Sequence, residues 1–232
     1  MQASFSYPGG KATIRNTILE YIPQEGIKYI EPFAGRGNMF FSVKDNCSFE
    51  EWQLNDLATY KFLKALRDTD LRDLKLLDFE SLRYKADQFD PIALILEPHI
   101  TVMGKGYNHG HRYGKECNQS FIDNCYAAQD ALKDVLITQI SWEQLEYTKD
   151  CFVYFDPPYI DTSSLPYSNI NHIELLEFLT SANFDWLLSG YYSDLYIGYL
   201  GKPIKTIEKR ADMSNYNKNG LDYRQEYLWS NF

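Results

Sequence analysis

Segments of strand type alternate with segments of helix type along this chain, and that alternation most constrains its fold. Strands are expected at residues 27–33, 52–56, 135–140, 151–155, 186–191, 205–209 and 224–230. Helices are expected between them at 12–21, 39–44, 57–66, 118–133 and 172–182. This order predicts an α/β sheet with helices on both faces. With 232 residues, one domain is the default, with room for an inserted subdomain.

The residues best suited to chemistry fall where the expected strands end. Residues 31–37 are rich in glycine and follow the first strand, while Asp56 closes the second. Residues 156–159 follow a buried strand, and residues 189–191 close another. Ligands bind beyond the carboxyl ends of the strands in sheets of this kind. The sequence therefore predicts one site at that edge of the sheet.

The tetrapeptide Asp156-Pro157-Pro158-Tyr159 is the most informative of these strand ends. Prolines fix the backbone and donate no hydrogen bond, which leaves nearby carbonyl groups as acceptors. A carboxylate and a carbonyl can accept from an amino group, and a tyrosine ring can stack on a base. This set suits chemistry on the amino group of a planar ring. The alternative is a simple turn, because Asp-Pro and Pro-Pro are common turn dipeptides.

The glycine-rich stretch 31–37 and Asp56 together suggest a nucleotide-like ligand. Glycines let the backbone turn tightly and approach a ligand closely. Asp56 lies 19 residues after Gly37, where a carboxylate commonly binds ribose hydroxyls. The third glycine of a dinucleotide fingerprint is absent. A dehydrogenase, or a tight turn without a ligand, is therefore also compatible with this stretch alone.

The formal net charge is −9, but positive charge is concentrated in two segments. Residues 102–118 hold three basic residues and one acid, and residues 200–232 hold six basic residues and four acids. Such segments can meet a polyanion locally, with salt-sensitive binding, or can simply be solvated loops. The four cysteines form no close pair of metal-ligand type, so we expect no metal and a reducing, intracellular setting. No apolar run reaches the roughly 20 residues that span a bilayer.

Taken in order, these motifs resemble the Dam-type DNA adenine-N6 methyltransferases, the D12 class with the alpha motif order. The matching pieces are residues 7–11, 31–37, Asn55-Asp56, 156–159, 189–191 and 226–232. The resemblance implies a Rossmann-like methyltransferase sheet with helices on both faces, plus an inserted, mainly helical target-recognition subdomain. The catalytic domain would then comprise residues 1–66 and 134–232, and the inserted region residues 67–133.

The same resemblance implies S-adenosylmethionine as cofactor and assigns residues to the two halves of the site. The residues implied around the cofactor are Tyr7, Lys11, Glu31, Phe33, Gly35, Gly37, Asp56 and Asp156. Those implied in catalysis are Asp156, Pro157, Pro158 and Tyr159. Asp56 would hold the ribose and Lys11 would approach the methionine end. Asp156 and the Pro157 carbonyl would accept the hydrogens of the adenine amino group, with the base flipped out of the duplex.

The expected partner is duplex DNA carrying a short recognition sequence, with a separate restriction endonuclease as a further possible partner. The location implied is cytoplasmic and DNA-associated. The first set of candidate DNA contacts lies in the polar insert and comprises Lys105, His109, His111, Arg112 and Lys115. The second lies between the two closing strands and comprises Lys209, Arg210, Asn215, Asn217 and Lys218. Phosphate contacts are expected from the cations, and base contacts from arginine or asparagine.

The sequence leaves several readings open beside DNA adenine methylation. The same chemistry could act on RNA adenine or on cytosine N4. A different class would be a catalytically silent nucleic-acid-binding module with this fold, which the intact Asp156 and Tyr159 disfavour. A protein-glutamine methyltransferase is less favoured, because the insert and the long closing loop would have no purpose. The insert aligns poorly with the family, so the target sequence stays open.

Overall fold

The fold was analysed in a computed structural model of the 232-residue chain. The structure describes residues 3–6, 11, 13–74, 79–101, 107, 118–160, 170–210 and 223–232. Statements about structure below refer to these residues.

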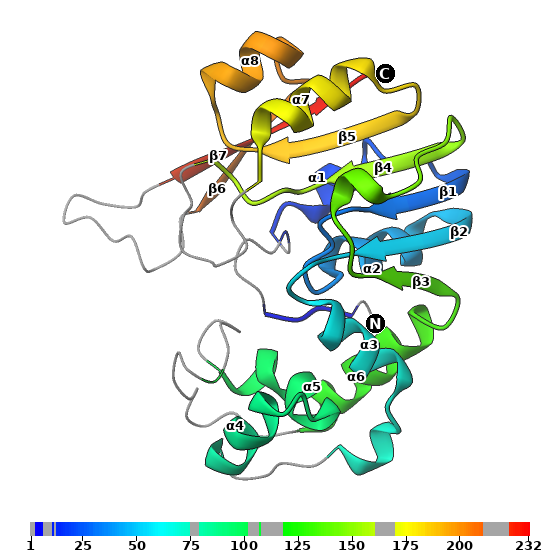
Figure 1. The fold of residues 1–232 in the computed structure, drawn as a ribbon, viewed down its shortest axis with the longest axis vertical. Coiled ribbons are helices and arrows are strands. Elements are labelled where there is room, and N and C mark those ends of the chain that lie inside the picture. The colour runs from blue at the N-terminus through cyan, green and yellow to red at the C-terminus, as the bar shows by residue number, and fades with distance from the viewer. Residues whose placement is uncertain are drawn as a thin grey trace, which may run out of the picture.

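A single seven-stranded sheet forms the centre of the molecule, in the order β3-β2-β1-β4-β5-β7-β6 (Figure 1). Five neighbouring strands run parallel, and β7 is antiparallel to both of its neighbours. The strands are β1 (Glu25–Glu31), β2 (Ser48–Asn55), β3 (Val135–Thr138), β4 (Cys151–Phe155), β5 (Asp185–Gly190), β6 (Lys205–Arg210) and β7 (Tyr223–Ser230). The predicted α/β sheet is confirmed.

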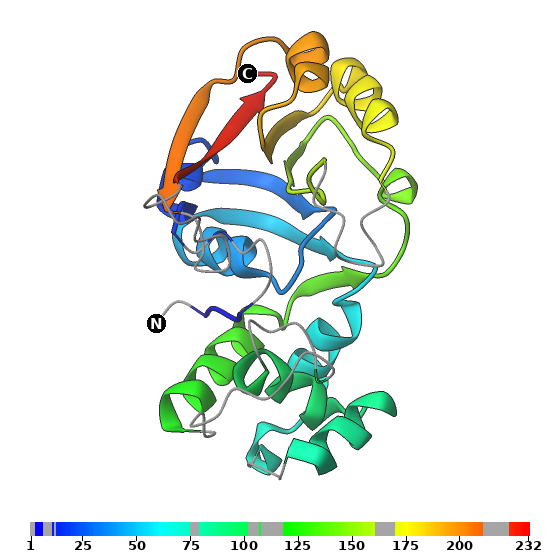
Figure 2. The ribbon, with the colours of Figure 1, turned by 90° about the vertical axis from the view of Figure 1, so that its left-hand side faces the viewer.

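Helices cover both faces of this sheet, as the two views at right angles show (Figures 1 and 2). Those associated with the first face are α1 (Arg15–Leu19), α2 (Asn38–Asn46), α3 (Tyr60–Asp68), α5 (Pro91–Ile100) and α6 (Gln119–Ala131). Those on the second are α7 (His172–Ser181) and α8 (Asp194–Leu200). The remaining helix, α4 (Phe79–Asp87), packs beside α5 at the β3 end of the molecule.

Alternating side chains in the central strands supply the two hydrophobic cores. In β4, Phe152 and Tyr154 enter the core with α1 and α2, while Val153 and Phe155 enter the core with α7. This period of two is what a strand buried on both faces requires. The near-continuous apolar run that predicted β4 is therefore explained by burial on both sides.

The strand order places a topological switch point between β1 and β4. After β1 the chain builds outward through β2 and β3, and β4 then starts on the other side of β1 and leads to β5. A crevice forms where successive connections diverge in this way, beyond the carboxyl ends of the strands. The glycine-rich loop after β1 and the tetrapeptide after β4 both start at this point.

Helix and strand boundaries differ from the sequence expectation at several places. Strand β2 begins at Ser48, four residues early, because exposed acidic residues mask its start. The first part of the insert expected to be mainly helical, residues 67–90, contains the end of α3, a 3-10 turn and α4 among its described residues. Helix α8 was not expected, because seven residues with an internal glycine carry little helical pattern.

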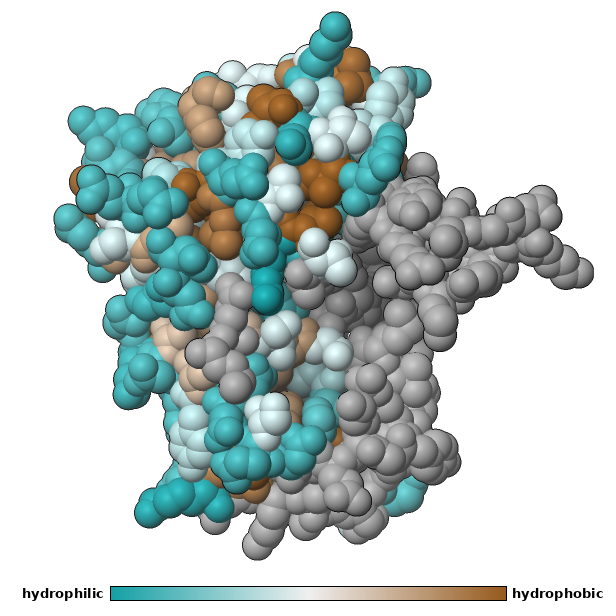
Figure 3. All heavy atoms as spheres, turned by 180° about the vertical axis from the view of Figure 1, so that it is seen from behind, coloured by the Kyte–Doolittle hydropathy of each residue, from teal (hydrophilic) through white to brown (hydrophobic). Residues whose placement is uncertain are grey.

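Helices α4, α5 and α6 lie in the region expected to be an inserted subdomain, and α3 and α5 pack closely together. The division into a catalytic domain and an insert stays a prediction. Where its residues are described, the rear face is mostly hydrophilic, with separate small apolar areas in its upper half (Figure 3). None of the helices in the described ranges is both long and apolar enough to cross a bilayer.

Candidate active site

Asp156 is the first residue after β4 and lies at the centre of a polar cluster. Its two carboxylate oxygens each lie 2.7 Å from Lys11 Nζ. The Ser189 hydroxyl donates to Oδ1 at 2.9 Å, and the Tyr159 hydroxyl donates to the same oxygen at 3.0 Å. The Asp156 side chain keeps 21% of its surface exposed, whereas that of Lys11 keeps only 3%. The carboxylate is therefore held firmly but can still be reached.

Two buried hydroxyl groups, one on β4 and one on β5, fix the orientation of the Asp156 carboxylate. The hydroxyls of Tyr154 and Ser189 lie 2.9 Å apart, inside the sheet. Since Ser189 donates to Asp156, Tyr154 supplies the hydrogen that Ser189 accepts. The chain Tyr154–Ser189–Asp156 thus orders the carboxylate through groups that cannot easily move.

Tyr159 has a phenol directed inward and a ring that lines a cavity. Its hydroxyl lies 3.0 Å from Asp156 Oδ1 and 3.4 Å from Glu226 Oε2. Burial and the charges of these two carboxylates hold the pKa of Tyr159 well above its usual range, so the phenol remains a hydrogen-bond donor. Its ring meets the ring of Tyr191 edge-on, with centroids 4.4 Å apart.

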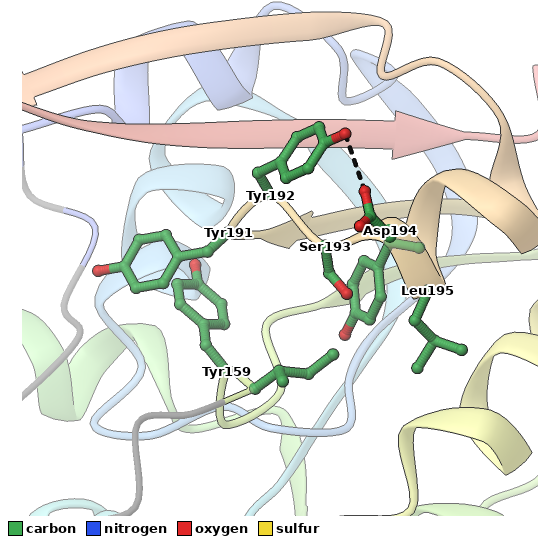
Figure 4. A pocket seen from close by; sticks show the side chains of 8 residues that line it. Tyr159, Tyr191, Tyr192, Ser193, Asp194 and Leu195 are labelled. Atoms are coloured by element: carbon green, nitrogen blue, oxygen red, sulfur yellow. Dashed lines mark hydrogen bonds between the residues drawn. The ribbon is translucent and has the colours of Figure 1, made fainter.

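The cavity beside Tyr159 has a volume of about 380 Å³ and lies between the tetrapeptide and the start of α8 (Figure 4). Four tyrosines contribute to its wall, and its lining residues are Tyr159, Ile160, Tyr191, Tyr192, Ser193, Asp194, Leu195 and Tyr196. Tyr192 donates a hydrogen bond to Asp194 at the rim. This volume lies within the roughly 300–1,000 Å³ typical of small-molecule sites.

The loop after β1 turns through two glycines in the left-handed region. Gly35 has φ 53° and Gly37 has φ 74°, values that residues with a Cβ rarely adopt. Gly37 precedes α2, and a Cβ there would lie 3.2 Å from the Phe41 ring. Both glycines are therefore required by the turn itself, as well as by any ligand that approaches it.

Asp56 ties this loop to the end of β2. Its Oδ2 accepts from the Gly35 amide at 2.9 Å, while Oδ1 accepts from the amides of Ala58 and Thr59 at 2.8 and 2.7 Å. A carboxylate offers about four acceptor positions, so three of them are used here. Oδ2 retains capacity for one more donor.

Glu31 ends β1 as a buried carboxyl that accepts from the Tyr29 hydroxyl at 2.7 Å. Burial raises the pKa of Glu31 to about 8, and the nearby Asp156 charge adds to the rise, although the Tyr29 hydrogen bond opposes it. Glu31 is therefore largely protonated at neutral pH. Phe33 lies two residues later, and the centroid of its ring is 6.4 Å from that of Phe155.

The ammonium group of Lys11 lies close to two carboxylates. Besides Asp156, it lies 3.9 Å from Oε2 of Glu226, a residue of β7 with no exposed side-chain surface. Burial alone would lower the pKa of Lys11, but the charges of Asp156 and Glu226 outweigh it and raise the pKa above the usual range. The cluster therefore carries one positive and two negative charges.

The structure brings together most of the predicted cofactor and catalytic residues at the switch point. Lys11, Asp156 and Tyr159 share one polar cluster, and the buried Glu31 lies near enough to feel the charge of Asp156. The glycine loop with Asp56 lies at the neighbouring strand ends. Pro157 is buried, while Pro158 is half-buried.

For several of the predicted site residues, the structure does not describe the side chain. Tyr7 lies outside the described residues, as do Lys105, His109, His111, Arg112, Lys115, Asn215, Asn217 and Lys218. Lys209 and Arg210 are described only as backbone at the end of β6. Over the described part of the chain, no group of His, Cys, Asp and Glu is placed to hold a metal ion.

Two site residues were not predicted individually from the sequence. Ser189 lay in a motif that resembled the family, but its contact with Asp156 depends on the pairing of β4 with β5. Glu226 lies two residues before the buried Leu228 and so shares its face of β7. A carboxylate on the inward face of a strand is the signal that could have identified it.

Comparison with known proteins gives a match for the N-terminal part of the chain. The model of the family described as D12 class N6 adenine-specific DNA methyltransferase matches residues 7–90. This range includes Lys11, the glycine loop and Asp56, and ends before Asp156. A comparison with curated protein sequences finds no match.

Solved structures resemble the chain only distantly. The SAH complex of SMU.472 has TM-score 0.42 and 10% identity over 97% of this chain, which spans 53% of that protein. An rRNA methylase from Streptococcus thermophilus has TM-score 0.37 and 9% identity, covering 94% of both chains. A dimethyladenosine transferase from Plasmodium falciparum has TM-score 0.39 and 12% identity over 97% of this chain and 62% of its own.

The residues matched by the family model include part of the polar cluster around Asp156 and the loop beside it. The matched range supplies β1, the glycine loop, β2 and the lysine that binds Asp156. The resemblance to the D12 class of N6 adenine-specific DNA methyltransferases, which the sequence motifs suggested, is thereby confirmed over residues 7–90.

Proposed function

We propose that this protein transfers a methyl group from S-adenosylmethionine to the N6 amino group of adenine in DNA. The observation that carries the proposal is the meeting of Lys11, Asp156 and Tyr159 at the switch point between β1 and β4. There a hydrogen-bond acceptor and an aromatic ring follow β4, and the glycine loop follows the neighbouring strand β1. The family match over residues 7–90 supports the choice of adenine and of DNA.

The residues at the strand ends fit S-adenosylmethionine. The remaining acceptor position on Asp56 Oδ2 suits a ribose hydroxyl, and the turn at Gly35 and Gly37 allows close approach of a ligand to the backbone. The cluster of Lys11, Asp156 and Glu226 has a net negative charge, which favours a cationic sulfonium over a neutral sulfur. When bound, this cofactor supplies a methyl group already activated for direct transfer.

The amino group of adenine is a poor nucleophile, because its lone pair is delocalised into the ring. Asp156 and the backbone carbonyl of Pro157 accept its two hydrogens and draw the nitrogen toward tetrahedral geometry. Ser189 and Tyr159 hold the Asp156 carboxylate in place for this task. Fixed acceptors of this kind lower the barrier because they need no reorganisation during the reaction.

The tyrosine-lined cavity is the place for the target base. In a duplex the base must leave the stack, which costs a few kcal/mol. Stacking on an aromatic ring returns roughly 1–3 kcal/mol per base, so the walls formed by Tyr159 and Tyr191 offset part of this cost. Tyr159 lines this cavity and also donates to Asp156, so one residue links the proposed place of the base to the proposed acceptor.

The decisive experiment measures transfer of labelled methyl from S-adenosylmethionine to DNA and, in parallel, to RNA. Nucleoside analysis of the products should yield N6-methyladenine from DNA. Asp156→Ala should reduce transfer by at least roughly 10²- to 10³-fold, because a fixed charged acceptor is lost. Asp150→Ala, at the exposed residue that precedes β4, should leave transfer unchanged.

Three other outcomes would contradict the proposal in different ways. Label found in N4-methylcytosine would mean that the target base is cytosine, with the same mechanism. Label found only in RNA adenine would mean that the substrate is RNA and not DNA. Binding of DNA without any transfer by the wild-type protein would indicate a catalytically silent binding module.

A further inference from the structure

Glu226 of β7 is a second carboxylate beside the lysine that binds Asp156. It has no exposed side-chain surface, and its Oε2 lies 3.9 Å from Lys11 Nζ. The Tyr159 hydroxyl lies between the two carboxylates, 3.0 Å from Asp156 and 3.4 Å from Glu226. One ammonium group and one phenol are therefore shared by two acids that come from different strands.

In this arrangement the oxygens of Asp156 are already occupied by donors. Lys11 lies 2.7 Å from both oxygens, and Oδ1 also accepts from Ser189 and Tyr159. An incoming amino group has to compete with a charged donor, which forms the stronger kind of hydrogen bond. Efficient acceptance of the amino hydrogens therefore requires that Lys11 release at least one oxygen.

Lys11 cannot release Asp156 without a second counter-ion. Its side chain is 3% exposed, and an uncompensated buried charge costs several kcal/mol. A movement of about 1 Å would bring Nζ from 3.9 Å to the roughly 2.8 Å of a charge-assisted hydrogen bond with Glu226. Glu226 is the carboxylate placed to compensate the charge over so short a path.

We propose that Glu226 is a positioning residue that receives Lys11 when the amino group of the target base takes its place on Asp156. This inference rests on the proposed function, since it assumes that Asp156 accepts the amino hydrogens. The ammonium group stays protonated throughout and moves between two acids. Glu226 acts through Lys11 and does not touch the reacting atoms.

The test compares Glu226→Gln with Glu226→Asp in the full chain. Glutamine keeps the size of the side chain and removes its charge, so Lys11 should remain on Asp156. We expect kcat to fall roughly 10- to 100-fold, as when a hydrogen bond to a charged group is lost. The Kd values for S-adenosylmethionine and for DNA should change less than about threefold. Glu226→Asp, which restores the charge, should recover part of kcat.

The matched control is Glu208→Gln, on the neighbouring strand β6. Glu208 is exposed, and replacing it removes the same charge from the same part of the sheet without touching Lys11. This variant should keep the wild-type kcat. Thermal unfolding of all variants distinguishes loss of activity from loss of fold.

A double substitution tests the dependence on Lys11 directly and removes both buried charges together. In a Lys11→Gln background, Glu226→Gln should cause no further loss of kcat, because there is no ammonium group left to receive. An equal further loss in that background would overturn the inference, as would an unchanged kcat in the single variant. A weaker cofactor Kd that accounts for the whole loss would make Glu226 a binding residue instead. Each comparison starts from active wild-type protein, so inactivity of the wild type would reject the proposed function and not this step.

Discussion

At the scale of single residues, the site contains carboxyl groups with contrasting surroundings. Asp156 is partly exposed and accepts from a lysine and two hydroxyls, whereas Glu31 is buried against Tyr29. Burial raises the pKa of Glu31 to about 8 and so favours its neutral form. Two carboxyl groups that lie at neighbouring strand ends thus have different partners and different access to solvent.

The pKa of Glu31, raised from 4.5 to about 8, predicts a pH dependence of stability. Between these values the folded state keeps a proton that the unfolded state has lost, so the free energy of unfolding falls as pH rises. Glu31→Gln removes this contribution. Between pH 5 and pH 8, the free energy of unfolding of the wild type should fall by about 2–4 kcal/mol more than that of the Glu31→Gln variant.

Urea unfolding at several pH values measures this difference. Glu25→Gln, at the exposed start of the same strand, provides the control and should follow the wild type. Parallel curves for Glu31→Gln and the wild type would show that Glu31 is ionised in the folded protein.

Residue identities in the site were predictable where a local motif carried them. The sequence 156–159 predicted an acceptor and an aromatic ring because both lie within four positions of one another. Glu226 was not predicted, since its contact with Tyr159 spans 67 positions and depends on where β7 enters the sheet. Local patterns indicate which groups are present, and strand order decides which of them meet.

At the scale of secondary-structure elements, an ion pair joins the glycine loop to α5. Arg36 lies between Gly35 and Gly37, and its guanidinium donates to the Glu97 carboxylate of α5. The arginine side chain is 5% exposed and the glutamate 20%. The loop that we assign to the cofactor is thereby fixed to the region that we expect to read the target.

Removing one partner of this pair should destabilise the protein. Glu97→Gln leaves the buried Arg36 without its carboxylate and should lower the free energy of unfolding by about 1–3 kcal/mol. The exposed Glu80 lies 4.0 Å from Arg83, and Glu80→Gln should change the free energy by less than about 0.5 kcal/mol. Chemical denaturation of both variants makes the comparison. Equal effects would mean that the Arg36–Glu97 pair adds no more than a surface pair.

The core elements were predictable from periodicity, and the short or charged ones were not. Strand β4 is apolar at every position because it is buried on both faces, so its bounds were predicted correctly. Helix α8 has seven residues and an internal Gly198, too short a segment to show a helical period. The charged stretch after α3 has weak periodicity, and it forms only one described helix there.

At the scale of the whole molecule, the strand directions gather the functional loops at one edge of the sheet. Strand β6 ends at Arg210 opposite Tyr223, the first residue of β7, at the edge where the parallel strands also end. Lys209 and Arg210 of the second set of predicted DNA contacts close β6 at that edge. Asn215, Asn217 and Lys218 follow in the sequence, between β6 and β7, and lie outside the described residues.

The predicted DNA contacts of the insert can be tested through salt dependence. Replacing Lys105, Arg112 and Lys115 together with glutamine should flatten the slope of log K against log salt concentration by about 2 to 3. Lys133, Lys149 and Lys202 precede strands β3, β4 and β6, at the opposite edge of the sheet. Replacing these three removes the same charge and should leave the slope unchanged. Equal slopes in both triple variants would remove the insert from the DNA interface.

The contact between Lys11 and Asp156 also has a consequence for the order in which parts of the protein fold. The two residues are separated by 145 positions, and Glu226 joins them from β7, the last strand in the sequence. Closing such long loops costs more chain entropy than forming neighbouring turns, so contacts of this range form late in folding. A partly folded chain in which only β1, β2 and their helices have formed would contain the glycine loop but lack Asp156, the acceptor that we propose. We therefore expect the proposed cofactor surface to form before the proposed acceptor joins it.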